Sequence, residues 1–251
     1  MNRDMGAGLV LAGTSEAREI CHLLASQEIR AIASMAGVTR RPQTLHLPTR
    51  TGGFGGAAGF KAYLSAQKIS WVLDATHPFA VQMSQTAASL CSEQNIPYLM
   101  LQRAPWTAQS QDQWHMIDDV SELPALIPEG HVVFLGTGRQ TLMDYHILQG
   151  RRLICRVIDG PIGPFPFENG KYAIGTPPFS LEEEVDFLRR ENVDWLVVKN
   201  AGGDGGRAKL DAARQLNLPV AMYRRKSIPS VRTVSTVRAA LGWIKEQGSN
   251  G

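Results

Sequence analysis

The chain has 251 residues, of which 43% are hydrophobic and 20% are charged, and its formal net charge is +3 at pH 7. This length and apolar content suffice for one large domain or two small ones with buried cores. No apolar run approaches the roughly 18 residues that cross a membrane, and the basic residues lack the clustering with aromatic residues typical of nucleic-acid surfaces. We therefore predict a soluble, cytoplasmic protein that binds neither membranes nor nucleic acids.

The first predicted strand covers residues 8–12, a short apolar run typical of a buried parallel strand. The run leads into a charged helix rather than a cleavage site, so we do not interpret it as a signal peptide. Between strand and helix lies a turn at Gly13, with Thr14 or Ser15 as the helix N-cap. The N–H groups at the start of a helix bind anions, so Gly13, Thr14 and Ser15 are predicted to bind a nucleotide pyrophosphate. An ordinary first turn of an α/β domain, without a ligand, is the alternative.

The second predicted strand covers residues 30–35, and its end bears on the choice of nucleotide. In dinucleotide-binding folds the residue that selects the ribose lies about 20 residues beyond the glycine turn. Ser34 occupies that position, Arg40 and Arg41 follow it, and residues 29–73 contain no acid. Because no carboxylate is available for a ribose 2′-hydroxyl, the segment favours the 2′-phosphate of NADPH. For each arginine, a solvated surface loop is the alternative.

A glycine-rich loop follows at residues 51–56, ahead of a predicted helix at 57–67. Glycine lets the backbone approach a ligand closely or adopt positive φ. Because periodic structure is predicted close by on both sides, we interpret the loop as a binding loop, with Gly53 near the cofactor. A flexible linker is the alternative.

The third predicted strand covers residues 69–73, and three polar residues follow shortly after it: Asp74, Thr76 and His77. Open α/β sheets bind their ligands beyond the carboxyl ends of the strands. We therefore predict that these three side chains function together, the alternative being a helix cap and surface polar residues. A helix to residue 93 and a fourth strand at 97–101 complete this half.

The composition becomes polar between residues 107 and 130, where we place a domain boundary. The predicted domains are an N-terminal lobe, residues 1–110, that binds the dinucleotide and a C-terminal lobe, residues 111–251, whose last helix can pack back on the first lobe. The second lobe repeats the alternation, with predicted strands at 131–135, 152–157, 193–198 and 219–223. We predict an α/β fold of two Rossmann-like, doubly wound parallel-sheet lobes with a cleft between them.

Three cysteines, Cys21, Cys91 and Cys155, lie far apart in the sequence. They form no C-x-x-C pair and have no Cys/His spacing typical of a metal site. We expect three unpaired thiols in a reducing compartment, and no bound metal.

Six motifs follow one another along the chain: AGTSEAR at 12–18, GGFGG at 52–56, DATHPFA at 74–80, RAPW at 103–106, GTGR at 136–139 and KNAGGDGGRAKLDAAR at 199–214. In this order and spacing the chain resembles the precorrin-6A reductase family of cobalamin biosynthesis, from residue 9 to about residue 225. DATHPFA after an apolar strand, followed by R-x-P-W, is the most specific element of the resemblance.

The resemblance implies an NADPH-dependent reductase that transfers hydride to one double bond of precorrin-6A, giving precorrin-6B. It also implies a substrate with many carboxylates, which arginines and lysines would bind, and allows product hand-over to other enzymes of the corrin pathway. The expected catalytic residues, for substrate contacts or proton supply, are His77, Asp74 and Lys199. Histidine has an ordinary pKa near neutrality, which favours His77 as proton donor, with solvent as the alternative. The expected substrate-binding residues are Arg18, Thr76, Arg103, Gly136, Thr137, Arg139 and Asn200.

Three other functions remain open. The residues do not separate precorrin-6A from its cobalt-loaded form, the substrate of the anaerobic route. A cofactor-free bilobed tetrapyrrole cyclase, similar to uroporphyrinogen-III synthase, would fail to bind NADPH. A nucleotide-binding sensor without turnover would not need the polar residues at Asp74–His77.

Overall fold

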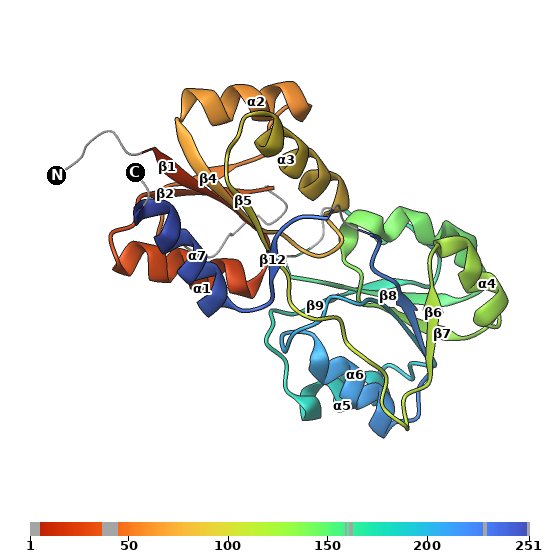
Figure 1. The fold of residues 1–251 in the computed structure, drawn as a ribbon. Coiled ribbons are helices and arrows are strands. Elements are labelled where there is room, and N and C mark those ends of the chain that lie inside the picture. Colours follow the sequence, from red (N-terminus) through yellow and green to blue (C-terminus); the bar gives the residue numbers. More distant parts are fainter. Residues whose placement is uncertain (1–5, 37–44, 159, 161–162, 228–229, 250–251) are drawn as a thin grey trace. The chain divides into compact units, whose positions relative to one another are not determined.

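The computed structural model describes residues 6–36, 45–158, 160, 163–227 and 230–249. The chain divides into two compact units (Figure 1). Unit 1 combines Met1–Ala104 with Lys226–Gly251, and unit 2 is Pro105–Arg225. The expected boundary after residue 110 differs from this division, in which unit 2 already begins at Pro105, and the chain beyond Arg225 supplies a strand and a helix to unit 1.

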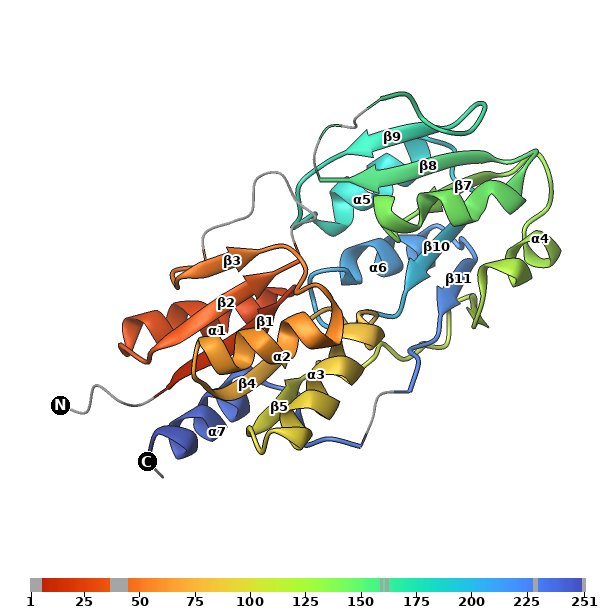
Figure 2. The ribbon, with the colours of Figure 1, turned by 90° about the horizontal axis from the view of Figure 1, so that it is seen from above.

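Unit 1 is built on a parallel sheet, and among the described residues its strands are β1 (Ala7–Ala12), β2 (Ala31–Met35), β3 (Thr49–Thr51), β4 (Ile69–Ala75), β5 (Tyr98–Leu101) and β12 (Thr233–Val234). Its helices are α1 (Ser15–Ser26), α2 (Gly56–Ala66), α3 (Val81–Glu93) and α7 (Val237–Ser249). The strand order is β3-β2-β1-β4-β5-β12, with every pairing parallel. Figure 2 shows the part of this sheet from β3 to β5. This is the strand order of dinucleotide-binding Rossmann sheets, whose switch point lies between β1 and β4.

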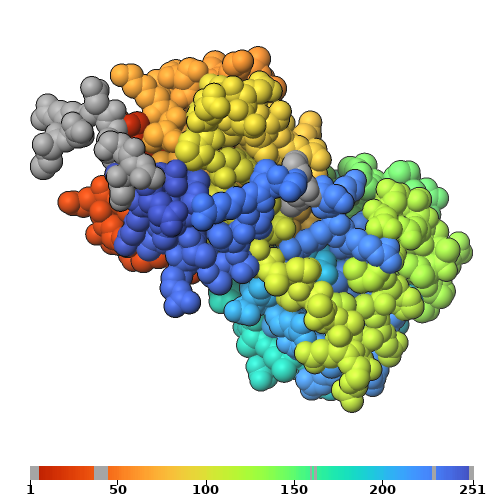
Figure 3. Space-filling model, viewed as in Figure 1, coloured from red at the N-terminus to blue at the C-terminus, as the bar shows by residue number. Residues whose placement is uncertain are grey.

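Both faces of this sheet are covered, which explains why β1 is a continuous apolar run with all six residues buried. Val10 faces α1 and α7, where it joins a core that includes Ile20 and Trp243. Its neighbours Leu9 and Leu11 face the opposite side, toward α2 and α3. Figure 1 shows the two helix layers, and Figure 3 shows the end of the chain, in blue, against the first helix, in orange-red.

Unit 2 has a second parallel sheet, whose strands in the described part of the chain are β6 (Trp114–Ile117), β7 (Val132–Leu135), β8 (Arg152–Val157), β9 (Lys171–Ile174), β10 (Trp195–Lys199) and β11 (Val220–Tyr223). Its helical elements are η1 (Val120–Glu122), α4 (Leu123–Leu126), η2 (Arg139–Leu148), α5 (Leu181–Arg190) and α6 (Arg207–Gln215), of which η1 and η2 are 3₁₀-helices. The order β9-β8-β7-β10-β11-β6 repeats that of unit 1, with β6 in the place of β12. Two Rossmann-like parallel sheets are thus confirmed.

Cys21, Cys91 and Cys155 are buried and unpaired, as predicted. Burial raises the pKa of Cys21 and Cys91 to about 12 and that of Cys155 to about 11, so all three thiols stay protonated at neutral pH. Within the described ranges, no helix combines the length and the apolar character needed to span a membrane.

Candidate functional site

The turn between β1 and α1 is fixed by Thr14, the N-cap of the helix. Its hydroxyl accepts a hydrogen bond from the backbone nitrogen of Ala17 at 3.2 Å and donates one to the carbonyl of Ala75 at 2.9 Å. A Cβ atom on Gly13 would lie 3.3 Å from the backbone nitrogen of His77. The turns after β1 and β4 are therefore packed together at the switch point of the sheet, with Gly13 and Ser15 exposed.

The first turn of α1 also carries an ion pair. Both carboxylate oxygens of Glu16 accept hydrogen bonds from Nη1 of Arg103, at 3.1 and 2.8 Å. Burial raises the pKa of Glu16, but hydrogen bonds from its own backbone and from Arg103 outweigh this and hold the pKa below its usual value. Arg103, an expected substrate ligand, thus pairs with Glu16, whereas Arg18 is exposed on the same helix.

At the carboxyl end of β4 the structure brings Asp74, Thr76 and His77 together but gives them different surroundings. Asp74 is only 1% exposed. Its carboxylate accepts hydrogen bonds from the backbone nitrogen and hydroxyl of Thr76, at 3.0 and 2.7 Å, and from the hydroxyl of Tyr98 at 2.7 Å. Burial, reinforced by the Asp74 charge, raises the pKa of Tyr98 well above its usual range, so this phenol remains a donor. Asp74 therefore anchors the turn from inside.

His77 and Thr76 are half-buried and lie on the outer side of this anchor. The Nδ1 atom of His77 accepts a hydrogen bond from the backbone nitrogen of Phe79 at 3.3 Å. In the neutral ring this contact leaves the proton on Nε2. The backbone of His77 is also the part of this turn that lies against Gly13.

Arg50, which the motifs did not single out, lies beside the expected ribose-selecting position. Ser34 is buried, and its hydroxyl accepts a hydrogen bond from Nη1 of Arg50 at 2.8 Å. Nη2 of Arg50 donates to the carbonyl of Gly53 at 2.9 Å. The predicted ligands Arg40 and Arg41 lie outside the described residues.

In unit 2, Gly136, Thr137 and Lys199 meet at the carboxyl ends of β7 and β10. Nζ of Lys199 lies 3.4 Å from the carbonyl oxygen of Thr137, and the Thr137 hydroxyl accepts a hydrogen bond from Tyr145 at 3.0 Å. Burial lowers the pKa of Lys199, and the nearby Asp144 charge opposes this in part.

Asn200 and Arg139 complete the predicted set in unit 2. The Asn200 side chain is buried, accepts a hydrogen bond from the Trp106 backbone nitrogen at 2.8 Å and donates one to the Trp106 carbonyl at 3.0 Å. The Trp106 indole donates to the carbonyl of Gly203 at 2.7 Å. Trp106 of the RAPW motif is thus held by the turn that follows β10, and the Asn200 amide is occupied by this contact. Arg139 is exposed at the start of η2.

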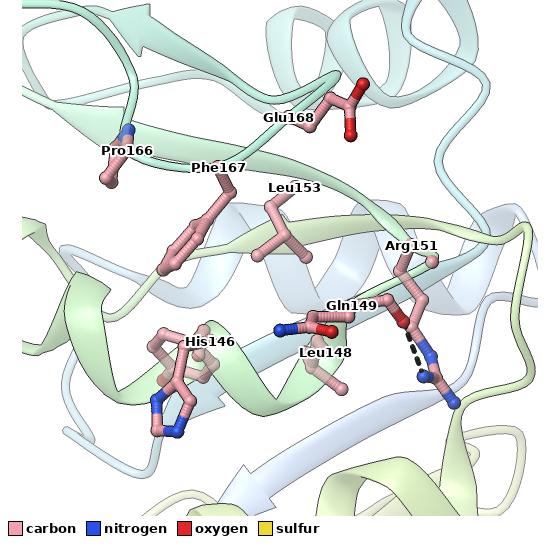
Figure 4. Close-up of a pocket in the computed structure, with 10 residues that line it drawn as sticks. His146, Leu148, Gln149, Arg151, Leu153, Pro166, Phe167 and Glu168 are labelled. Atoms are coloured by element: carbon pink, nitrogen blue, oxygen red, sulfur yellow. Dashed lines mark hydrogen bonds between the residues drawn. The ribbon is translucent and has the colours of Figure 1, made fainter.

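A cavity of about 410 Å³ in unit 2 lies away from these turns. Figure 4 shows His146 and Gln149 beside the apolar side chains of Leu148, Leu153 and Phe167. Gly150 and Arg151, which also line it, directly precede β8, so this cavity lies at the amino end of that strand. Parallel sheets place their sites at the carboxyl ends.

The strand order of unit 1 and the glycine turn at its switch point place the molecule in the class of Rossmann-like α/β proteins. The family model described as Precorrin-6x reductase CbiJ/CobK matches residues 9–245, and the chain belongs to this family.

Individual relatives agree with the family match. The chain is 40% identical to a protein of Rhodobacter capsulatus named Precorrin-6A reductase, with 96% of each chain covered. It is 36% identical to a protein of that name from Rhodococcus erythropolis, over 94% of this chain and 96% of the relative. A solved structure named CobK precorrin-6A reductase superposes with a TM-score of 0.92 at 40% identity, covering 97% of this chain and 98% of that one. A Methanothermobacter thermautotrophicus protein named Cobalt-precorrin-6A reductase is 26% identical over 90% of this chain and 78% of its own length.

Proposed function

We propose that this chain reduces one double bond of precorrin-6A with NADPH, giving precorrin-6B in cobalamin biosynthesis. The observation that carries the proposal is a 40% identity, over 96% of both chains, to a relative named Precorrin-6A reductase. The family match over residues 9–245 supports the same reaction class. Metal-free precorrin-6A is favoured over the cobalt-loaded form, because the relative named for the cobalt form is only 26% identical.

The residues of unit 1 fit a dinucleotide. When bound, NADPH supplies the hydride. Gly13, Thr14 and Ser15 would hold its pyrophosphate through backbone N–H groups, because the turn is exposed and has no side chain at Gly13. Ser34, Gly53, Arg40 and Arg41 are the residues proposed for its adenosine end, in a segment without acids.

The proton and the substrate carboxylates are assigned to side chains of the chain itself. We assign the proton to Nε2 of His77, with Lys199 as the second candidate, because the pKa of Lys199 is lowered toward neutrality. Asp74 positions Thr76 and His77 through its hydrogen bonds to Thr76. The exposed Arg18 and Arg139 are proposed to attract carboxylates.

The test is to mix the purified protein with NADPH and either metal-free or cobalt-loaded precorrin-6A, and to follow nicotinamide absorbance and product mass. We expect oxidation of NADPH with the metal-free substrate and a product heavier by two hydrogen atoms. Faster turnover of the cobalt form would reassign the substrate. Absence of oxidation with either substrate would refute the proposal.

A further inference from the structure

We propose that Arg50 is the residue that recognises the 2′-phosphate of NADPH and so determines the preference for NADPH over NADH. The inference deepens the proposed function and rests on its use of NADPH. It adds a residue that the motif pattern did not single out.

The first observation is the place of Arg50 in the sheet. β3 pairs in parallel with β2, and Arg50 lies opposite Ser34 in the register. Ser34 is near the carboxyl end of β2, where Rossmann sheets place the residue that contacts the adenosine ribose. Arg50 therefore presents a positive charge beside Ser34, the position where an NAD-specific protein has an acid.

The second observation is how firmly the guanidinium is held. It donates to the Ser34 hydroxyl at 2.8 Å and to the Gly53 carbonyl at 2.9 Å. It also lies over the ring of Phe54, with 3.9 Å between the guanidinium carbon and the ring centroid. A side chain fixed in this way loses little conformational freedom when it binds an anion.

The third observation is the charge that remains for a ligand. Among the residues that the structure describes, no carboxylate forms an ion pair with Arg50. A guanidinium has more N–H donors than the two contacts above use, and its geometry suits paired hydrogen bonds to a phosphate. The buried Ser34 also positions Arg50, because its hydroxyl accepts a hydrogen bond from the guanidinium.

The test compares Arg50→Gln with the wild type by calorimetry, using NADPH, NADH and 2′,5′-ADP as probes. Loss of a charged hydrogen-bonding partner is expected to weaken binding of NADPH and 2′,5′-ADP about 10- to 100-fold, while the Kd for NADH stays within about twofold. Lys61→Gln removes an exposed basic residue of α2 and serves as the matched control, with all affinities unchanged. In the same assay, the double variant Arg40→Gln/Arg41→Gln shows how much the other two arginines contribute to NADPH affinity.

Several outcomes would overturn the inference. An unchanged ratio of NADPH to NADH affinity in Arg50→Gln would do so, as would equal weakening for both nucleotides, which is the mark of a structural role. If Arg50→Gln does not fold, as judged by its thermal transition, Ser34→Ala and Arg50→Lys are used instead, and both are expected to narrow the preference. A wild-type protein that does not bind NADPH would instead refute the proposed cofactor, so the two failures are distinguishable.

Discussion

The polar side chains at the carboxyl end of β4 differ in burial. Asp74 is enclosed and accepts hydrogen bonds from Thr76 and Tyr98, whereas His77 is half-buried. A carboxylate with its acceptor positions occupied holds a turn in place, while a partly exposed imidazole can meet a substrate. These roles could not be distinguished from the sequence, because Tyr98 lies on another strand.

Asp74→Asn tests the anchoring role. An amide keeps the size of the side chain but turns one acceptor into a donor, which would face the Tyr98 hydroxyl or the Thr76 donors. We expect the free energy of unfolding to fall by about 1–3 kcal/mol, measured by urea denaturation. Tyr98→Phe should also lower it, because it leaves one oxygen of the buried Asp74 carboxylate without its donor. Unchanged stability of Asp74→Asn would contradict the anchoring role.

His77→Ala tests proton supply. If the imidazole delivers the proton, its loss should slow single-turnover reduction about 100-fold or more, while the Kd for NADPH changes little. His77→Gln keeps a polar side chain without a titratable proton and should be equally slow. A variant that retains the full rate would remove His77 from the mechanism.

The burial of Lys199 leads us to predict how kcat/KM depends on pH. Because burial lowers its pKa below the ordinary 10.5, the charge of Lys199 is lost at a lower pH than the charge of an ordinary lysine. If this charge assists the reaction, kcat/KM should fall on the alkaline side with a midpoint below 10.5. Lys199→Arg should shift that fall to higher pH, since arginine stays protonated. If kcat/KM falls at the same pH in Lys199→Arg as in the wild type, the fall is due to another group.

Among the elements, the predicted strands that the structure contains are those with buried apolar runs, such as β1, β7 and β10. Three strands were not predicted, namely β3, β9 and β12, which are short and have no fully buried residue. Such strands form because a neighbouring strand offers hydrogen bonds, and local sequence does not encode this. The predicted last strand, at 219–223, is consequently not the last.

Only part of the candidate site could likewise be predicted from the sequence. Positions at strand ends, such as Gly13, His77 and Lys199, could be predicted because parallel strands place their carboxyl ends at one edge. The hydrogen bonds between Asn200 and Trp106 could not be predicted, because these residues are 94 positions apart in the sequence. Arg50 was missed because it lies on a three-residue strand without an apolar pattern.

α7 is predicted to be essential to the stability of unit 1. Trp243 is 5% exposed and packs edge-to-face on Trp71 of β4, with ring centroids 6.3 Å apart. Trp243→Ala should lower the free energy of unfolding by about 3–5 kcal/mol in a urea titration. Arg238→Ala, at an exposed position of the same helix, should change it by less than about 0.5 kcal/mol. If Trp243→Ala changes the free energy of unfolding as little as Arg238→Ala does, α7 is not needed for the stability of unit 1.

In the whole molecule, both units have the same strand order. In each sheet the edge strand next to the fifth strand is not part of the run of alternating strands and helices that forms the rest of the sheet. This edge strand is β12 in unit 1 and β6 in unit 2, which explains why unit 1 needs both ends of the chain. Both units place glycine turns and polar side chains at the carboxyl ends of their central strands, where Rossmann-like sheets bind ligands.

The most direct test of the proposed reaction follows one hydrogen. The protein is mixed in ordinary water with precorrin-6A and NADPH that carries deuterium at the transferable position, and the product is analysed by mass spectrometry. We predict one deuterium atom in each product molecule, with the second added hydrogen coming from exchangeable protons. A reduced product without deuterium, when either face of the nicotinamide is labelled, would contradict hydride transfer from NADPH.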